Sequence, residues 1–589
     1  MLAYENEMFL TSMQEDGLTI VAKGLGLETV FLNVIKVHSD PGNLVLVLGC
    51  NDQEEQWIIN KLEAQVNKEK KLSPGLMKLN PCQGETHLPK RVTTDVSTTE
   101  RQSVYLDGGV LFITTRILVV DFLMDRIPAQ LITGILVYRA HRIIDSCQES
   151  FILRLFREKN KTGFIKAFSG SPVSFSQGFC QVERVMKNLF IRHLHLWPRY
   201  QSTVTSALAA VQPQVVEVHL QLTPRMQDVQ TAVLDLISFT LKELKRLNPS
   251  LDTEELTVEN SMSKSFHKIL QRELDPVWHQ LSGKSRQLVS DLKTLRLVLT
   301  YLTQYDCITF YNFVSTLKTT ESAIKSGGWV LLDSAETLFI SARDRVFENM
   351  DKDNKKKNGK EDVKMFEENP KWTEIAKIIE EIKEEMTVTK KDNVNESVMI
   401  VTRDERTGRQ VNEFLTQGSD MVLGRMYNKC FGEKYGFLTK FSEDNEPKNI
   451  KEFKHKGKGK KSAPAVEVET DNDVTEKPDD ESKSFLSTTF HSLDSCESFD
   501  TFLLLSESRP SFIILYDCDM TFVRQVEAYQ ASNTDVDVRV YFLLYKGSVE
   551  EQAYLTTLRR EKNAFENLIK AKSEMVVPED REGRDVDNR

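Results

Sequence analysis

A glycine-containing turn near the N-terminus is the first place in the sequence where chemistry could occur. Residues 22–30 (AKGLGLETV) follow a short apolar run and include Gly24 and Gly26. A phosphate-cradling loop has such glycines, because they let backbone N–H groups approach the phosphates, and it then needs a lysine and a serine or threonine. Thr29 is present, but Glu28 stands where the lysine is needed.

The carboxylate of Glu28 argues against ATP at this loop. At ~4 Å and an effective dielectric constant near 20, a carboxylate and a phosphate charge repel each other by about 4 kcal/mol. A strand-to-helix turn that needs glycine would by itself account for the loop. The sequence therefore predicts a loop that has the glycines of a phosphate loop but does not bind a nucleotide.

A second candidate position follows the apolar run at residues 134–138. In nucleoside-triphosphate helicases two acidic residues at this place hold Mg²⁺ and polarise the attacking water. This sequence has Tyr138 and Arg139 instead, and His141 follows them. We expect Arg139 to pair with a neighbouring carboxylate. The alternative is that it neutralises the charge of a phosphate. We expect His141 to have a structural role. Two altered motifs in the helicase order indicate a degenerate nucleotide site.

Two further turns point to nucleic acid. Thr114, Thr115 and Arg116 come at the end of the apolar run at residues 109–115, where helicases place a hydroxyl-bearing loop on the nucleic-acid backbone. Arg116 is the best candidate for a phosphate contact, although a solvated surface arginine would have the same sequence. The turn at residues 168–172 (FSGSP) is similar to a turn that helicases carry after a later strand.

The segment at residues 520–534 aligns with the helicase segment that bears a glutamine and two arginine fingers. In this alignment the three positions are Glu527, Ala531 and Thr534. Arginine fingers stabilise the transition state of phosphoryl transfer. We therefore expect no catalytic residue, no metal ligand and no cofactor in this chain.

The elements that must position these residues alternate between short apolar runs and helical segments. Runs of this kind, each ending in a glycine or polar cluster, are typical of buried parallel strands in a βαβ sheet, where ligands bind beyond the strand ends. They lie at residues 18–22, 44–50, 109–115, 134–138 and 163–168. Apolar residues at i, i+3 and i+4 predict helices at residues 229–247 and 285–302. Strand-then-helix order returns at residues 397–415, 512–529 and 538–569.

These patterns predict two α/β lobes separated by a helical insert. The expected boundaries are 1–222 for the first lobe, 223–348 for the insert, 349–368 for a charged linker, 369–578 for the second lobe and 579–589 for a C-terminal tail. A charged loop at residues 443–484, expected to be disordered, interrupts the second lobe. Within it, residues 454–461 (KHKGKGKK) fit a nuclear-localisation patch, a DNA-attracting tether or a solvated charge run.

Composition excludes several classes of protein. A length of 589 residues corresponds to about three to five domains, and 40% hydrophobic with 28% charged residues is typical of a folded soluble protein. The net charge of −10 means that any contact with DNA has to be local. The sequence predicts neither a membrane span nor a secretory signal. Eight cysteines without metal-like spacing indicate reduced intracellular thiols.

Three segments of the sequence resemble the XPF family of DNA repair endonuclease subunits. They are residues 113–168, 541–569 (YFLLYKGSVEEQAYLTTLRREKNAFENLI) and 575–585 (MVVPEDREGRD), and the resemblance covers almost the whole chain outside the charged segments. It implies two RecA-like parallel-sheet lobes of a degenerate superfamily-two helicase, with an α-helical insert and no ATPase activity. It also implies a nuclear protein of nucleotide excision and interstrand crosslink repair.

The family's nuclease motif has the form Gly-Asp-x…Glu-Arg-Lys-x-x-x-Asp, and its carboxylates bind the Mg²⁺ that activates water. This sequence contains no Gly-Asp dipeptide and no Glu-Arg-Lys tripeptide. It also lacks the tandem helix-hairpin-helix region through which the family pairs with a smaller ERCC-type subunit. By this resemblance the chain corresponds to the non-catalytic part of a nuclease subunit, as a fragment, a truncated gene model or a splice form.

The partners that the resemblance implies are branched or single-strand/double-strand junction DNA and repair scaffold proteins, with no membrane. Two other functions stay open beside a DNA-binding nuclease subunit. One is an active DNA helicase or translocase, against which Glu28, Tyr138 and Arg139 argue. The other is a pure interaction scaffold, which the acidic balance favours slightly. Whether the chain is itself an enzyme is left open.

Overall fold

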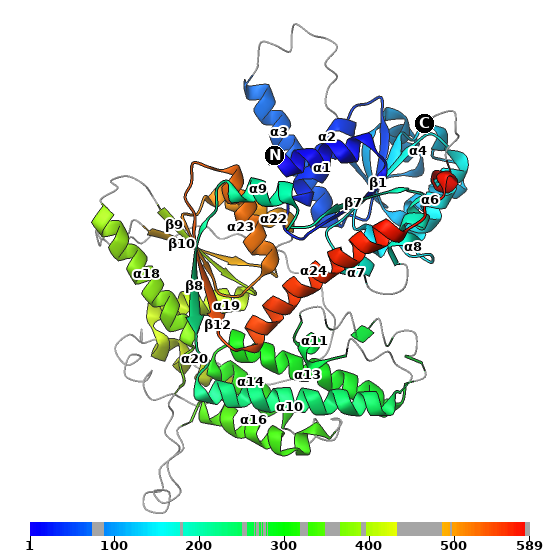
Figure 1. Ribbon diagram of the computed structural model, residues 1–589. Helices are drawn as coiled ribbons and strands as arrows, with labels where there is room; N and C mark the ends of the chain where they lie inside the picture. Colours follow the sequence, from blue (N-terminus) through cyan, green and yellow to red (C-terminus); the bar gives the residue numbers. More distant parts are fainter. Residues whose placement is uncertain are drawn as a thin grey trace, which may run out of the picture.

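The computed structural model in Figure 1 consists of two α/β lobes and a helical insert. It describes residues 1–72, 88–176, 181–249, 256–263, 266, 270–271, 274, 278–279, 281–318, 328–347, 366–389, 396–432, 486–494 and 498–583. Most of the linker expected at 349–368 lies outside these residues, as do the whole loop at 443–484 and the lysine-rich segment within it. Across the described residues, no helix combines the length and apolar character that a bilayer span requires.

The first lobe is a seven-stranded parallel sheet in the order β3-β4-β2-β5-β6-β1-β7. Its strands are β1 (Gly17–Val21), β2 (Leu44–Leu48), β3 (Lys90–Val92), β4 (Gly109–Ile113), β5 (Gly134–Val137), β6 (Phe164–Ser169) and β7 (His193–Trp197). Its helices are α1 (Ala3–Gln14), α2 (Leu27–His38), α3 (Asp52–Leu72), α4 (Thr98–Asp107), α5 (Thr115–Leu123), α6 (Gln148–Lys159), α7 (Val173–Ser176), α8 (Gln181–Leu189) and α9 (Ser202–Ala209), with short 3₁₀ turns η2 (Ala129–Leu131) and η3 (Ala140–Arg142).

The five strands expected from apolar runs are present, because the central strands are buried on both faces and read as continuous apolar sequence. The two edge strands were missed. Their sequences are KRV in β3 and HLHLW in β7, and neither is a continuous apolar run. An edge strand needs less apolar surface than a central one, so it leaves a weaker signal in the sequence.

The second lobe is a five-stranded parallel sheet in the order β10-β9-β11-β12-β8. Its strands are β8 (Gln214–Leu220), β9 (Glu396–Thr402), β10 (Leu486–Ser492), β11 (Phe512–Leu515) and β12 (Arg539–Tyr545). Its helices are α18 (Pro370–Thr389), α19 (Glu405–Gln417), α20 (Ser419–Phe431), α22 (Ser498–Ser508), α23 (Met520–Ser532) and α24 (Val549–Glu574). The predicted strand-then-helix order of this lobe is confirmed.

The position of β8 corrects the expected end of the first lobe at residue 222. Residues 214–220 pair with β12 across their whole length, with Gln214 opposite Arg539 and Leu220 opposite Tyr545. The second sheet therefore begins before the helical insert, which leaves it between β8 and β9. Nearness in sequence suggested the wrong lobe, since only the pairing with a strand more than 300 residues away places β8.

The insert packs helices on one another around its own core. It contains α10 (Pro224–Leu247), α11 (Val258–Met262), α13 (Gly283–Gln304), α14 (Cys307–Leu317), η5 (Trp329–Leu331) and α16 (Asp333–Asp344). The apolar stripes of α10 and α13 meet in this core, which the side chains of Leu236 and Leu292 share. Thr223 caps α10 through a bond from the Met226 N–H, and Pro224 begins the helix. The predicted helices are confirmed.

The long helix α24 of the second lobe contacts both the helical insert and the first lobe. Figure 1 shows it running obliquely from beside the insert to the first lobe. Near its middle Arg559 bonds to Glu259 of α11, and further along Phe565 and Leu568 are buried in the core of the first lobe. The beginning of the expected tail is also docked there, because Arg581 pairs with Glu183 of α8 at 3.2 Å. The C-terminal end of the described chain therefore packs against its N-terminal lobe.

Candidate functional site

The glycine loop connects β1 to α2 at the edge of the first sheet where the strands end. Gly24 has φ of +82° and Gly26 has φ of +69° and caps α2. Both angles lie in the left-handed region, which favours glycine. The turn therefore favours glycine at both positions, and Glu28 lies in the first turn of α2 as expected.

Carboxyl groups of the first lobe surround this loop. The carboxyl group of Glu5, on α1, packs against Gly26, where an added Cβ would lie 2.1 Å from Glu5 Oε1. Burial, with a smaller contribution from the nearby charge of Glu28, raises the pKa of Glu5 to about 7. Burial also raises the pKa of Glu28. A bound phosphate would meet two acidic groups where a phosphate loop offers a lysine.

The second lobe covers the other side of the loop. An added Cβ at Gly24 would lie 2.6 Å from the carbonyl oxygen of Thr521, which is on α23. Arg524 Nη1 donates to the Lys23 carbonyl at 3.1 Å, and the Lys23 N–H donates to Glu561 Oε2 at 3.4 Å. Arg524 and Glu561 pair with each other at 2.6 Å, with side chains only 9% and 7% exposed. The carboxylate of Glu561 thus accepts a backbone N–H of the loop.

The altered acidic motif lies beside the loop. Tyr138 is buried, with its ring centroid 4.8 Å from that of Phe31, and burial raises its pKa well above the usual value. Arg139 has φ of +55°, and its Nη2 lies 2.5 Å from Oε1 of the buried Glu54. The ion pair with a neighbouring carboxylate that the sequence favoured is therefore present.

His141 also has a neighbour within the first lobe. Its Nδ1 lies 2.9 Å from Oγ of Ser169, a buried residue at the end of β6. Ser169 belongs to the FSGSP turn, so two motifs singled out in the sequence meet in space. The contact places His141 next to the end of β6.

The positions aligned with the helicase glutamine and arginine fingers have other roles. Glu527 Oε2 accepts a bond from Nε of Arg199 at 3.1 Å, which joins α23 to the segment after β7. Ala531 packs against the first-lobe core, and Thr534 is exposed. Two of the three positions thus hold the lobes together.

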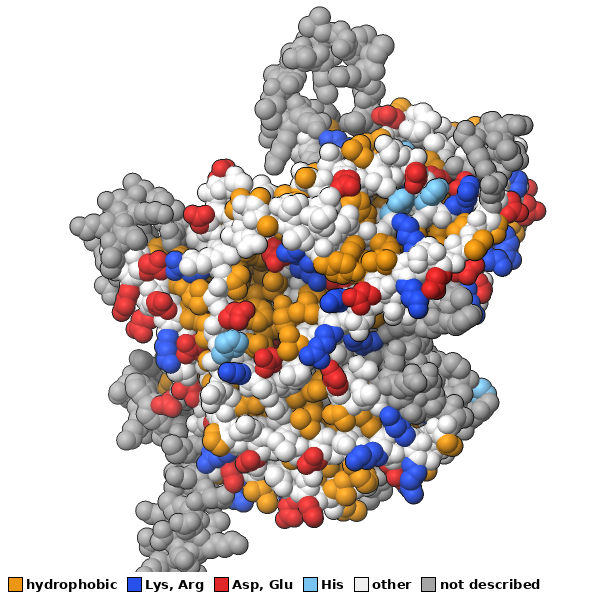
Figure 2. Space-filling view, in the orientation of Figure 1, with side chains coloured by type: hydrophobic (Ala, Val, Ile, Leu, Met, Phe, Trp, Pro, Cys, Tyr) orange, Lys and Arg blue, Asp and Glu red, His pale blue; other side chains and the backbone are white. Residues whose placement is uncertain are grey.

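The candidate DNA-binding residues lie at the end of β4. Thr114 is exposed and is the N-cap of α5, Thr115 donates to Glu149 at 3.3 Å, and Arg116 is exposed. They are on one turn of the chain, at the same edge of the sheet as the glycine loop. In the view of Figure 2, basic side chains are interspersed with acidic ones, so an electrostatic contact on this face has to be local.

Within the described residues, no group of three or more His, Cys, Asp or Glu side chains is placed to hold a metal ion. The residues present therefore do not fit the Mg²⁺ site that the family resemblance implies for a nuclease domain. Arg524 and Glu561 are not among the site residues expected from the sequence. No sequence signal marks them, because they lie about 500 residues from the loop and meet it only through the docking of the lobes.

Comparison with known proteins gives one consistent set of relatives. No protein-family model matches the sequence. The chain is 42% identical to the DNA repair endonuclease XPF of Cricetulus griseus, with 100% of this chain and 70% of that protein covered. It is 41% identical to the protein of that name in Mus musculus, with the same coverage. It is 33% identical to the DNA repair protein rad16 of Schizosaccharomyces pombe, with 98% and 69% covered.

A solved structure agrees with the fold. The crystal structure of the Pyrococcus furiosus Hef helicase domain matches with a TM-score of 0.50 at 14% identity, over 95% of this chain and 98% of that one. At this identity the match concerns the fold alone. The expected architecture of two RecA-like lobes with a helical insert is confirmed.

Proposed function

The chain belongs to the XPF family of DNA repair endonucleases, and from that premise we propose that it is a helicase-like DNA-binding platform without ATPase activity. It serves a structure-specific endonuclease that acts in nucleotide excision and interstrand crosslink repair in the nucleus. The observation that carries the ATPase part of the proposal is the contact of Glu561 and Arg524 with the glycine loop.

Three features of the loop support the absence of nucleotide chemistry. A γ-phosphate needs positive groups and free N–H donors, whereas the loop faces the carboxyl groups of Glu5 and Glu28. One loop N–H already donates to Glu561. The metal-binding acids of a helicase are replaced by the buried Tyr138 and by Arg139, which is paired with Glu54. Binding of ATP would require all three arrangements to change together.

DNA is the proposed ligand of the strand ends, with Thr114, Thr115 and Arg116 as candidates for backbone contacts. Hydroxyl and guanidinium groups at a strand end can donate to phosphate oxygens. The preferred substrate is branched or junction DNA. Because such contacts release counterions, affinity for DNA should fall steeply with salt.

ATP hydrolysis by the purified chain tests the first part. We expect no hydrolysis above background, with or without splayed-arm DNA, because the loop is occupied. DNA-stimulated hydrolysis that a further substitution in the loop, such as Thr29→Ala, abolishes would show instead an active helicase.

Binding of DNA tests the second part. Fluorescence anisotropy should show tighter binding to splayed-arm than to duplex DNA, and a binding constant that falls with salt. Absence of both would favour the pure scaffold, which the net charge of −10 supports. The scaffold alternative predicts co-purification with a repair scaffold protein without retention of DNA. Pairing with an ERCC-type smaller subunit is also proposed for the family's full-length subunit.

A further inference from the structure

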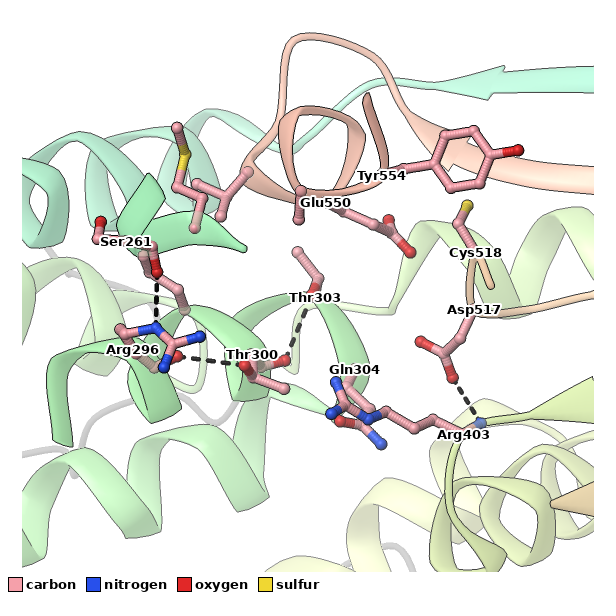
Figure 3. A pocket seen from close by; sticks show the side chains of 14 residues that line it. Ser261, Arg296, Thr300, Thr303, Gln304, Arg403, Asp517, Cys518, Glu550 and Tyr554 are labelled. Carbon is pink, nitrogen blue, oxygen red and sulfur yellow. Dashed lines mark hydrogen bonds between the residues drawn. The ribbon is translucent and has the colours of Figure 1, made fainter. Parts of the chain in front are cut away.

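A pocket separate from the glycine loop lies between the insert and the second lobe. Its volume is about 140 Å³, and Figure 3 shows the side chains that line it. Arg403 directly follows β9, and Asp517 follows β11, so the pocket lies beyond the carboxyl ends of two parallel strands. Ligands of open α/β sheets bind in such positions. One water molecule in the liquid occupies about 30 Å³. The pocket could therefore hold several waters, and it is large enough for a phosphate group.

Arg296, on α13, carries a positive charge into this pocket. Its Nε and Nη2 each donate at 2.6 Å to backbone carbonyls, those of Ser261 and Ser263. These acceptors are neutral, and within the described residues no carboxylate lies at ion-pair distance from Arg296. The guanidinium also lies over the ring of Phe266, with Cζ 5.2 Å from the ring centroid, so the insert holds it in place.

Arg403 brings a second guanidinium from the second lobe, and Figure 3 shows both side chains at the same pocket. The guanidinium of Arg403 forms an ion pair with the exposed Asp494, with Nε 3.7 Å from Oδ2. Burial and the charge of Arg403 lower the pKa of Arg296 to about 10. Two like charges that face one cavity repel each other, and an anion between them would relieve that repulsion.

Two acidic side chains also line the pocket, but both have partners. Asp517 Oδ2 accepts the backbone N–H of Arg403 at 2.8 Å. Glu550 Oε1 lies 2.7 Å from Nζ of the buried Lys371. Among the described residues, Oε2 of Glu550 is buried without a hydrogen-bond partner. The pocket therefore holds two guanidinium groups beside two carboxyl groups, each of which has at least one contact of its own.

We propose that Arg296 and Arg403 together bind one phosphate group, which bridges the insert to the second lobe. Guanidinium groups suit phosphate because their planar N–H donors match its oxygens. This inference rests on the proposed function in one respect, since that function makes a DNA backbone the source of the phosphate. Binding there would couple the position of the insert to that of the DNA strand.

The test uses the full chain with Arg296→Gln, Arg403→Gln and the double substitution. Fluorescence anisotropy with labelled splayed-arm DNA is measured over a series of salt concentrations. Each single change should weaken binding about tenfold and reduce the slope of log K against log salt by roughly 0.7 to 0.9. The double variant should lose little more, since both arginines hold the same phosphate. Additive losses, or slopes equal to that of the unsubstituted chain, would overturn the proposal.

Arg246→Gln on the insert and Arg409→Gln on the second lobe are matched controls, because both side chains are exposed and already paired with glutamates. They remove the same charge and should leave the slope unchanged. Arg403→Gln also guards against misfolding, because its side chain makes none of the bonds that anchor α11. Unfolding midpoints of all variants are compared first.

Inorganic phosphate distinguishes the two sources of the ligand. The ³¹P line of free phosphate is recorded with the DNA-free chain and with Arg403→Gln. If DNA does not bind, the proposed function fails, and broadening by the unsubstituted chain alone then assigns the pocket to free phosphate. If neither DNA nor phosphate responds to the substitutions, the pocket is not a phosphate site.

Discussion

Arg139 shows how a single residue can keep a backbone shape while it changes the chemistry. Its φ of +55° places a non-glycine residue in the left-handed region, which is uncommon and costs energy. At this turn a helicase has a metal-binding acid, whereas here a guanidinium pairs with the buried Glu54. Removing the arginine would take away the guanidinium that pairs with the buried carboxylate of Glu54, so the residue contributes to stability.

Glu5 gives a pH-dependent prediction at the residue scale. Its pKa rises from the ordinary 4.5 to about 7, which corresponds to about 3 kcal/mol against the charged form. The folded state therefore binds the proton more tightly than the unfolded state, and stability falls as pH rises from about 4.5 through 7. In Glu5→Gln this loss is absent. The thermal unfolding midpoint of the variant should therefore rise relative to that of the unsubstituted chain as the pH increases from 5 to 8.

The matched control for that measurement is Glu7→Gln, an exposed residue of the same helix. Its unfolding midpoint should stay at a constant distance from that of the unsubstituted chain across the pH range. A constant difference for Glu5→Gln as well would mean that the carboxyl of Glu5 titrates normally.

At the scale of elements, α23 and α24 close the glycine loop. Arg524 from α23 and Glu561 from α24 pair with each other and with the backbone of Lys23. Each loop glycine is also in tight contact, Gly24 with α23 and Gly26 with α1. The loop is therefore packed as a structural joint between the lobes.

Arg524→Ala tests this joint. It leaves Glu561 buried without its cation, which should cost about 3 to 5 kcal/mol, while Arg524→Ala with Glu561→Leu should recover much of that loss. Amide hydrogen exchange at residues 22–26 should become faster in the single variant. Arg559→Ala, on α24 like Glu561, removes an exposed pair with Glu259 of α11 and should change stability by at most about 1 kcal/mol. Equal effects of Arg524→Ala and Arg559→Ala would contradict a buried joint.

At the scale of the whole molecule, each lobe is completed by a segment that is distant from the rest of that lobe in the sequence. The strand β8 lies in the second sheet although it precedes the insert, and α24 completes the core of the first lobe although it follows the second. Each lobe thus depends on a segment from the other end of the chain. We expect the two lobes to unfold together.

Phe565→Ala tests that dependence. Truncation of a buried phenylalanine costs about 3 to 5 kcal/mol, and the loss should appear in the first lobe, whose core contains Phe565. Urea unfolding followed by hydrogen exchange should show earlier opening of β1 and β6. Ile569→Ala, at a neighbouring position that is 46% exposed, should have a small effect. If Phe565→Ala loosened only the insert, α24 would not be part of the first core.

Sequence by itself determined the elements whose signal is local. Buried parallel strands read as apolar runs, and packed helices show apolar residues at i, i+3 and i+4, because each pattern reflects burial along a short stretch. The altered residues Glu28, Tyr138 and Arg139 and the family were also readable, since they depend on residue type and order alone.

Only the tertiary structure decided which distant segments meet. The sheet to which β8 belongs, the contact of Glu561 with Lys23 and the shared pocket of Arg296 and Arg403 all join residues more than 100 positions apart. The partner of Arg139 was likewise unnamed by the sequence, although a carboxylate was expected. Such pairings depend on how whole elements dock, and docking is set by the summed packing of many side chains that no local pattern records.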